Sequence, residues 1–280
     1  MMSNENISEA RKPYRVRYAL KFRVVQVADI IQLSQHMLRI VFQGDELADF
    51  NSAGFDDHVK VFFPAQPGDK LVVPSMTESG ISFPDGYKPV MRDYTPLCFD
   101  NAAKTLTIDF VVHEAGSATT WAQQAKVGDQ LVIGGPRGSM IVPMAYDAYV
   151  FFGDDAALPA IARRLQELPA ESRALVVAEI DSEVDRLDLA CAAQLETLWL
   201  YRKGQPAGQP DHFLSAIEQV LQQAQWPAGD TFTWVAAETS VARQLRKVLM
   251  ARFGLAKDQI KAAGYWQHGA AGAHTSIGDD

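Results

Sequence analysis

Cysteine is scarce in this sequence and long apolar runs are absent. The only two cysteines among the 280 residues, Cys98 and Cys191, lie far apart and form no CxxC pair, which excludes zinc ribbons and thioredoxin-like redox sites. Unpaired thiols are typical of a reducing compartment. No stretch approaches the roughly 18 apolar residues of a membrane-spanning helix, and residues 1–12 lack the apolar core of a secretory signal. We therefore expect a cytoplasmic protein without a membrane span.

Positive charge is in the minority. The 26 Lys and Arg residues against 34 Asp and Glu give a formal net charge of −8, which argues against a general nucleic-acid binder because the phosphate backbone attracts basic proteins. An anionic ligand must then meet a local basic patch. Apolar residues make up 48% of the chain, enough for a large core, and the length predicts about two domains.

The common nucleotide, hydrolase and metal motifs are missing. There is no GxGxxG after a strand and no GxxxxGK[ST], so the dinucleotide fingerprint and the P-loop are excluded. There is also no GxSxG elbow and no HExxH. The six histidines do not cluster at metal-ligand spacing, and we expect no metal site of the protein's own.

What is present divides into two halves with different periods. In the first half, short segments rich in branched residues are separated by turn signals such as Gln43-Gly44-Asp45 and Val127-Gly128-Asp129. The predicted strands there are 24–30, 37–42, 58–63, 94–99, 105–112 and 130–133, with one helix at about 118–124. Short strands at this spacing indicate a sandwich or a barrel.

In the second half, strands alternate with helices. Strands are predicted at 149–152, 174–178, 197–200 and 231–235, and helices at 158–168, 212–223 and 241–253. This alternation predicts a parallel sheet. The predicted fold class is therefore an antiparallel β-barrel followed by an α/β domain with a parallel sheet. This layout resembles ferredoxin-reductase-type flavoproteins, and the resemblance implies that the barrel binds FAD and that the parallel sheet binds a nucleotide. The expected division is a flexible N-terminus at 1–14, the barrel at 15–144, the α/β domain at 145–269 and a mobile tail at 270–280.

The segment Arg92-Asp93-Tyr94-Thr95 carries the first chemical signal. Alternate residues of a strand share a face, so Arg92 and Tyr94 point the same way. An Arg fork suits a pyrophosphate, while Tyr94 and Thr95 can border a flavin ring. Taken alone, the segment also fits a surface Arg beside an ordinary strand Tyr.

Two further segments add donors for anions. Residues 112–122 run from a strand through small residues into a helix, whose N-terminus offers N–H groups to phosphate; an N-capped helix with nothing bound is the alternative. The turn 134–139 holds Arg137 between glycines, and such turns are often only turns.

The order of these motifs resembles the siderophore-interacting, FAD-binding family, whose members include ferric-siderophore reductases. RDYTP, DFVVHEAGSATTWAQQAKVGDQL and GGPRGS are followed by GDDAALPAI, WVAAE and GYWQHG, with DDHVKVFFP upstream. The resemblance covers roughly residues 15–269. Leu97, Ala156, Ala237 and Gln267 stand where the family often has Arg, Thr, Gly and Arg, which weakens single contacts at the expected sites.

The resemblance implies the following site residues. The FAD contacts are Arg92, Asp93, Tyr94, Thr95, Asp109, Val111, His113, Gly116, Ser117, Ala118, Thr119, Thr120 and Trp121. The NAD(P)H side is formed by Gly153, Asp154, Ala156 and Glu238, although Glu238 could instead cap the following helix. The substrate contacts are Lys60, Arg137 and Trp266, of which Trp266 could equally cover the flavin or belong to the core.

The resemblance also implies the reaction. NADPH or NADH reduces FAD, and the flavin passes single electrons to Fe³⁺ held by an anionic siderophore, which then releases Fe²⁺. The flavin carries the chemistry, so no catalytic side chain is expected. A ferredoxin-type electron donor is a further candidate partner. The alternatives are a flavoprotein reductase with another acceptor and a non-enzymatic iron–siderophore binding protein. The donor, the siderophore and the oligomeric state stay open.

Overall fold

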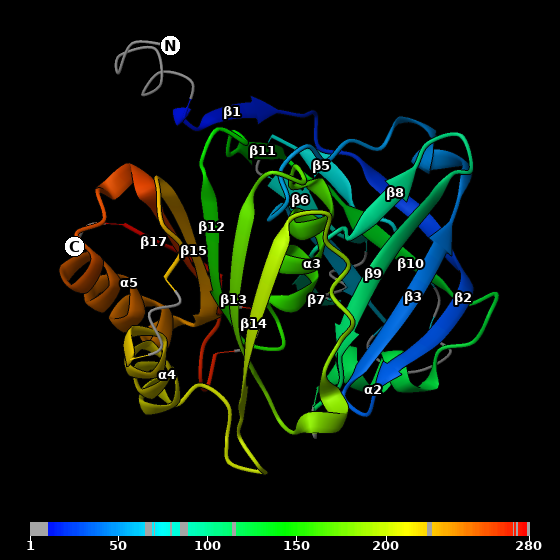
Figure 1. The fold of residues 1–280 in the computed structure, drawn as a ribbon. Coiled ribbons are helices and arrows are strands. Elements are labelled where there is room, and N and C mark those ends of the chain that lie inside the picture. The colour runs from blue at the N-terminus through cyan, green and yellow to red at the C-terminus, as the bar shows by residue number, and fades with distance from the viewer. Residues whose placement is uncertain are drawn as a thin grey trace. The chain divides into compact units, whose positions relative to one another are not determined.

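The computed structural model of the chain describes residues 11–64, 69, 71–78, 80–84, 89–113, 116–222, 226–270, 272 and 274–278. They form two compact units, one of Arg15–Ile141 and one that runs from Val142 onward and includes residues 11–14. We call them the barrel unit and the sheet unit (Figure 1). The sequence predicts a boundary at 144/145, and the two units divide between Ile141 and Val142.

The barrel unit is built on a curled, seven-stranded antiparallel sheet with the strand order β7-β4-β10-β2-β3-β9-β8. Its elements are β1 (Tyr14–Arg17), β2 (Phe22–Ser34), β3 (Met37–Gln43), η1 (Asp45–Asp49), β4 (Val59–Phe63), β5 (Ser75–Thr77), β6 (Gly80–Ser82), β7 (Val90–Tyr94), β8 (Cys98–Asp100), β9 (Thr105–Val111), α2 (Ser117–Gln124), β10 (Gln130–Gly134) and β11 (Gly138–Ile141). β1 pairs with β11 and β5 with β6 in separate two-stranded sheets.

Alternating apolar residues on these strands fill one core. On β3 the side chains that belong to this core are Leu38, Ile40 and Phe42, and the residues between them are more exposed. Directly opposite on β9 lie Phe110, Ile108 and Leu106, so both strands turn the same face inward. Helix α2 packs against β4, β7 and β9 and lies across this core.

The prediction of a single strand at 94–99 is wrong, because this range contains the end of β7, a break and the start of β8. Pro96 lies between the two strands and has no N–H to donate to a ladder. The chain breaks there and changes partner, since β7 pairs with β4 while β8 pairs with β9. The break leaves Thr95 buried just beyond β7.

The sheet unit contains a six-stranded sheet with the order β14-β13-β12-β15-β16-β17, parallel except for the last pair. Its elements are β12 (Ala148–Gly153), α3 (Leu158–Glu167), β13 (Arg173–Ile180), η3 (Glu183–Asp185), β14 (Gln194–Tyr201), α4 (Pro210–Gln222), β15 (Thr231–Glu238), α5 (Thr239–Phe253), η4 (Lys257–Gln259), β16 (Ile260–Trp266) and β17 (Thr275–Ile277). The predicted parallel sheet is confirmed.

Helices cover both faces of this sheet. α3 packs on β12 and β13, while α4 and α5 pack together on the opposite face (Figure 1). Consecutive residues of β12 divide between the faces, and Val150 and Phe152 belong to the core under α4 and α5. Both faces are covered, which explains why β12, β13 and β15 are almost continuously apolar.

Sequence patterns do not reveal the last two strands. β16 contains Ala262, Ala263 and Gly264, which have low strand propensity. A side chain at Gly264 would collide with Thr239, because a Cβ there would lie 2.3 Å from Thr239 Oγ1. Part of the predicted mobile tail pairs with β16 as β17, and Ile277 packs on the core.

The predicted flexible N-terminus also differs where it is described, because Arg11 pairs with Asp230 at 2.7 Å. Residues 1–10, Glu114, Ala115, Gln223, and 271, 273, 279 and 280 of the tail lie outside the described residues. None of the helices in the described part of the chain combines the length and hydropathy that a bilayer-spanning helix needs.

Candidate cofactor and substrate sites

Strand β7 sends its predicted site residues to two faces. Arg92 and Tyr94 lie opposite Val61 and Val59 of β4, whose side chains belong to the barrel core. The Tyr94 ring packs on Phe110 with centroids 4.4 Å apart. Burial raises the pKa of the Tyr94 hydroxyl, and the nearby Arg92 charge offsets this only in part. The half-buried Arg92 guanidinium donates to the carbonyl of Met91 at 2.7 Å, which leaves other N–H groups of its fork for a ligand.

On the other face of β7, Asp93 pairs with Lys60. The two residues are directly opposite in the β4–β7 ladder, and Lys60 Nζ lies 2.6 Å from Asp93 Oδ1. A residue predicted to contact FAD and one predicted to contact the substrate therefore form one ion pair.

The N-terminus of α2 is the strongest anion-binding feature of the barrel unit. Gly116 precedes the helix with φ 145°, a conformation that favours glycine, and no described side chain caps the helix. The first intrahelical bond runs from the Thr120 N–H to the Gly116 carbonyl. The N–H groups of Ser117, Ala118 and Thr119 therefore have no acceptor within the helix, and the helix dipole adds positive potential beside them.

A pocket of about 1200 Å³ opens at this helix. This volume is somewhat larger than that of a typical small-molecule site, which is about 300–1,000 Å³. Its lining includes the apolar residues Phe63, Leu71 and Pro89 and the hydroxyl residues Ser117 and Thr120. Apolar surface together with the free N–H groups of α2 matches a ligand that combines an aromatic ring with phosphates. The residues present therefore fit a flavin dinucleotide, although Arg92 and Tyr94 are not among the described lining residues.

Trp121 anchors α2 while lining the pocket. Its ring stacks on Phe42 at 6.4 Å and meets Phe63 edge-on at 5.7 Å. At the other end of the preceding loop, Nδ1 of the exposed His113 lies 3.4 Å from Thr119 Oγ1. These contacts hold the first turn of α2 against the barrel.

Asp109 is engaged in a buried ion pair. Both of its oxygens accept hydrogen bonds from the Arg39 guanidinium, at 2.7 and 2.8 Å, and its side chain is 1% exposed. The hydrogen bond raises the pKa of Arg39. The pair lies on the face of β3 and β9 opposite the core, as does Val111, so Asp109 has little capacity left for a cofactor.

Arg137 is exposed on the turn between β10 and β11, and a network that sequence reasoning missed lies beside it. The buried Asp57 accepts from the Ser52 hydroxyl, the Gly54 N–H and the Ser139 hydroxyl. These bonds tie the segment before β4 to β11. A polar residue ahead of the apolar run 59–63 is the only local signal for it.

In the sheet unit, the strand order reverses between β12 and β15. The chain proceeds from β12 outward to β13 and β14 and then returns to β15 on the other side. Gly153 and Glu238 end these two strands at the same carboxyl edge, where open parallel sheets bind ligands. A Cβ at Gly153 would lie 2.5 Å from the Ala157 Cβ, so glycine permits α3 to start close to the strand.

Asp154 and Trp266 meet at this edge, although 112 residues separate them. Trp266 Nε1 donates to Asp154 Oδ2 at 2.7 Å, and the Ala156 N–H donates to Oδ1 at 3.0 Å. Burial raises the pKa of Asp154 to about 7, with a smaller contribution from the Asp155 charge. Trp266 is half-buried and meets the His268 ring edge-on at 4.9 Å, so it is not a core residue.

A buried ionic cluster next to Asp154 was also missed. Glu179 is fully buried at the end of β13, with His212 Nδ1 at 3.0 Å and an Arg202 nitrogen at 3.6 Å. Arg202 also pairs with Asp155 at 2.6 Å. Burial raises the pKa of Glu179 more than Arg202 lowers it. The signal for this cluster in the sequence is a single acid near the end of a mostly apolar strand.

Glu238 is a helix cap. It precedes α5, and its carboxylate accepts from the N–H of Ser240 at 2.6 Å and of Val241 at 3.2 Å. Burial acts to raise the pKa of Glu238, but the hydrogen bond from the Ser240 hydroxyl and those from the backbone N–H groups outweigh it, so the pKa is lowered. Of the two roles left open by the sequence, the structure thus displays the capping one.

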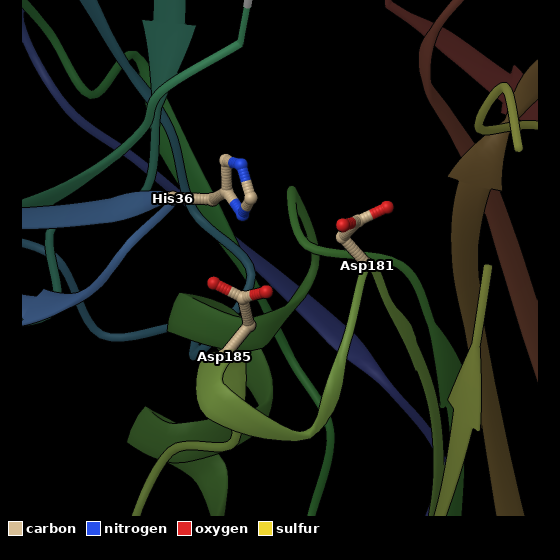
Figure 2. A group of neighbouring side chains, drawn as sticks. All are labelled: His36, Asp181 and Asp185. Atoms are coloured by element: carbon tan, nitrogen blue, oxygen red, sulfur yellow. The ribbon is translucent and has the colours of Figure 1, made fainter. Parts of the chain in front are cut away.

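Two further acids follow β13. Figure 2 shows Asp181 and Asp185 on this segment; His36, also labelled there, belongs to the barrel unit, at the turn between β2 and β3. The Gly204 N–H donates to Asp181 at 3.0 Å, and the Ser182 hydroxyl donates to Asp185 at 2.8 Å. These bonds give both carboxylates a local structural role.

Comparison with known proteins identifies matches over both units. Residues 26–140 match the siderophore-interacting FAD-binding domain, and residues 146–269 match the siderophore-interacting protein family. The NADPH-dependent ferric-chelate reductase of Escherichia coli is 38% identical over 262 residues, covering 91% of this chain and 97% of the relative. The ferric vibriobactin reductase of Vibrio cholerae is 31% identical, covering 85% and 86%.

A solved structure agrees with these sequence matches. The siderophore utilization protein from T. fusca superposes with a TM-score of 0.85 at 32% identity, over 94% of this chain and 98% of that one. Together the comparisons confirm the predicted family, the fold class, FAD as the cofactor and an oxidoreductase class. The roles of individual residues stay predictions.

Proposed function

Since the chain belongs to the siderophore-interacting, FAD-binding family, we propose that it is an FAD-dependent ferric-siderophore reductase driven by NADPH or NADH. The observation that carries the proposal is the uncapped N-terminus of α2 beside a pocket of about 1200 Å³. The names of the two reductase relatives supply the substrate class.

The barrel unit holds the cofactor in this proposal. The free N–H groups at 117–119 and the Arg92 fork bind the pyrophosphate, and Tyr94 and Thr95 border the flavin ring. FAD bound there would supply the redox chemistry, because a flavin can take up a hydride from a nicotinamide and release single electrons to Fe³⁺. The aromatic packing of Tyr94 and Trp121 keeps β7 and the first turn of α2, which carry these cofactor contacts, rigid.

The sheet unit receives the electron donor at its carboxyl edge. Gly153, Asp154 and Ala156 border the nicotinamide beside Trp266, and the Asp154–Trp266 hydrogen bond orients the indole. A ferredoxin-type donor is the other candidate. Lys60 and Arg137 attract the anionic ferric siderophore. We place the reaction in a reducing cytoplasm, in keeping with the free thiols of Cys98 and Cys191.

Anaerobic mixing of the full-length protein tests the proposal. Flavin absorbance is followed after addition of NADPH, NADH or a reduced ferredoxin, and Fe²⁺ capture is followed after addition of a panel of ferric siderophores. We expect a bound flavin, its reduction by one nicotinamide, and Fe²⁺ release. A protein without flavin would be a carrier, and flavin reduction without Fe²⁺ release would indicate a different acceptor.

A further inference from the structure

An ion pair joins Asp93, on the predicted cofactor strand β7, to Lys60, one of the two cations predicted to contact the substrate. Asp93 lies between Arg92 and Tyr94 in sequence but faces the opposite side of β7, where it meets Lys60 at 2.6 Å. The Lys60 side chain is 37% exposed and that of Asp93 is 17% exposed. A ligand in solution can therefore reach this pair.

Arg137 lies close to the same pair along the sheet. Lys60 is directly opposite Gly134 in the β4–β10 ladder, and Arg137 follows Gly134 by three residues. Arg137 is exposed and makes no ion pair with any residue that the structure describes. Among the described residues, Lys60 is thus neutralised by a neighbour, whereas Arg137 has no such partner.

We propose that Asp93 sets the charge selectivity of the substrate site by holding Lys60 in an ion pair for which the ferric complex must compete. The inference rests on the proposed function and deepens it. A half-exposed pair of this kind is weak, so a complex with several negative charges can draw Lys60 away from Asp93. A neutral complex cannot draw Lys60 away from Asp93, because it has no net charge that attracts the ammonium group.

The consequence scales with the charge of the substrate. With Asp93 ionised, the three groups Lys60, Asp93 and Arg137 carry one net positive charge; replacing Asp93 by Asn leaves two. Attraction is proportional to the product of the charges, so the substitution strengthens binding more for each added negative charge. Asn has nearly the same shape and still accepts a hydrogen bond from Lys60, so packing changes little.

Asp93→Asn in the full-length protein tests this selectivity. KM is measured for a neutral ferric trihydroxamate, a singly negative ferric aminocarboxylate and a triply negative ferric tris-catecholate. We expect the smallest change in KM for the neutral complex and a KM about three- to tenfold lower for the tris-catecholate at low salt, with an intermediate shift for the third. High salt should shrink the difference.

Asp29→Asn is the matched control. It removes the same charge from β2. Phe22 of β2 and Lys60 of β4 both pair with Gly134, and Asp29 lies seven residues beyond Phe22, which is about 20 Å along a strand. We expect no charge-dependent change in KM. Equal shifts in both variants would overturn the proposal, as would a KM change in Asp93→Asn of equal size for all three complexes.

The Lys60→Gln background separates action through Lys60 from direct repulsion by Asp93. The gain from Asp93→Asn should fall by at least about half in that background, since the released cation is missing. A gain of undiminished size would overturn the role assigned to the ion pair. If the wild-type protein reduces none of the complexes, the proposed function itself fails, which is a different result from reduction without charge selectivity.

Discussion

Neighbouring residues on β7 meet different surroundings because the strand alternates. Arg92 and Tyr94 share a face with core residues of β4, whereas Asp93 between them pairs with Lys60 on the other face. A four-residue motif thus contributes to two separate functions in our proposal. The sequence period alone indicates the alternation, but it says nothing about the cross-strand partner.

Arg92→Ala should leave the fold intact and weaken FAD retention. One charge-assisted phosphate contact contributes roughly 1.5–3 kcal/mol, which corresponds to a Kd about ten- to a hundredfold higher. Titration of the apoprotein with FAD measures this Kd. Arg15→Ala, which removes an exposed Arg from β1, is the control. FAD binding of wild-type strength in Arg92→Ala would refute the assigned role.

Glu238→Ala should destabilise the protein by about 1 kcal/mol, because alanine cannot accept the N–H groups of Ser240 and Val241. The pKa of Glu238 is lowered in the fold from its ordinary value of 4.5. Its stabilisation is therefore complete at neutral pH and is lost as the pH falls through the lowered value. Urea unfolding at several pH values measures both effects.

The alternative role of Glu238 makes the opposite prediction. If this carboxylate borders the nicotinamide, Glu238→Ala slows flavin reduction while the free energy of unfolding stays unchanged. Glu238→Gln provides the comparison, since its amide oxygen can still accept one of the two helix N–H groups and should recover part of the lost stability.

At the scale of elements, the predicted site residues of the sheet unit lie at or just beyond the ends of strands. β12, β15 and β16 end side by side, which brings Asp154, Glu238 and Trp266 to one edge of the sheet. Helix α5 begins directly after β15, and four residues separate the end of β12 from the start of α3. Gly153 and Gly264 allow these close approaches, since a Cβ on either would collide with Ala157 or Thr239.

Asp154 should make stability depend on pH. Its pKa is raised by burial from 3.8 to about 7, so the folded protein holds a proton that the unfolded chain releases above about pH 4. The contribution of this group to stability therefore falls as the pH rises from about 4 to 7, by a few kcal/mol at most. Asp154→Asn removes this dependence.

Urea unfolding of wild type and Asp154→Asn at about pH 5 and about pH 8 measures the difference. Relative to wild type, the variant should gain stability between the two pH values, because only the wild type acquires a buried charge. A stability difference that is the same at both values would show that Asp154 does not titrate in this range.

At the scale of the whole molecule, net charge and local charge oppose each other. The chain carries −8, yet the proposed substrate is anionic. Local cations must therefore provide the attraction. Lys60 and Arg137 lie on neighbouring parts of the barrel unit, and Asp93 moderates one of them.

Reversal of both charges, Lys60→Glu with Arg137→Glu, should raise KM for an anionic ferric siderophore at least about tenfold. Each cation contributes roughly 1 kcal/mol at a partly exposed site, and less at high salt. Reduction of FAD by nicotinamide should change little, and a neutral chelate should lose less affinity. Equal losses for charged and neutral acceptors would mean that the flavin site had been disturbed.

The sequence by itself determined the order of the two units, most of their elements and the family. Strand and helix periods, turn residues and ordered motifs are local features, so they can be recognised without knowledge of the tertiary contacts. For the same reason the sequence located the free α2 N-terminus and separated Arg92 and Tyr94 from Asp93.

Only the tertiary structure decided which distant residues meet. It pairs Asp93 with Lys60, Asp109 with Arg39, and Asp154 with Trp266, and it breaks the predicted strand 94–99 at Pro96. It also adds β17 and β16, and in β16 pairing and packing override the weak strand propensity of Ala262, Ala263 and Gly264. Charge, burial and hydrogen-bond capacity depend on these partners, because a side chain is available to a ligand only where the fold has not already satisfied it.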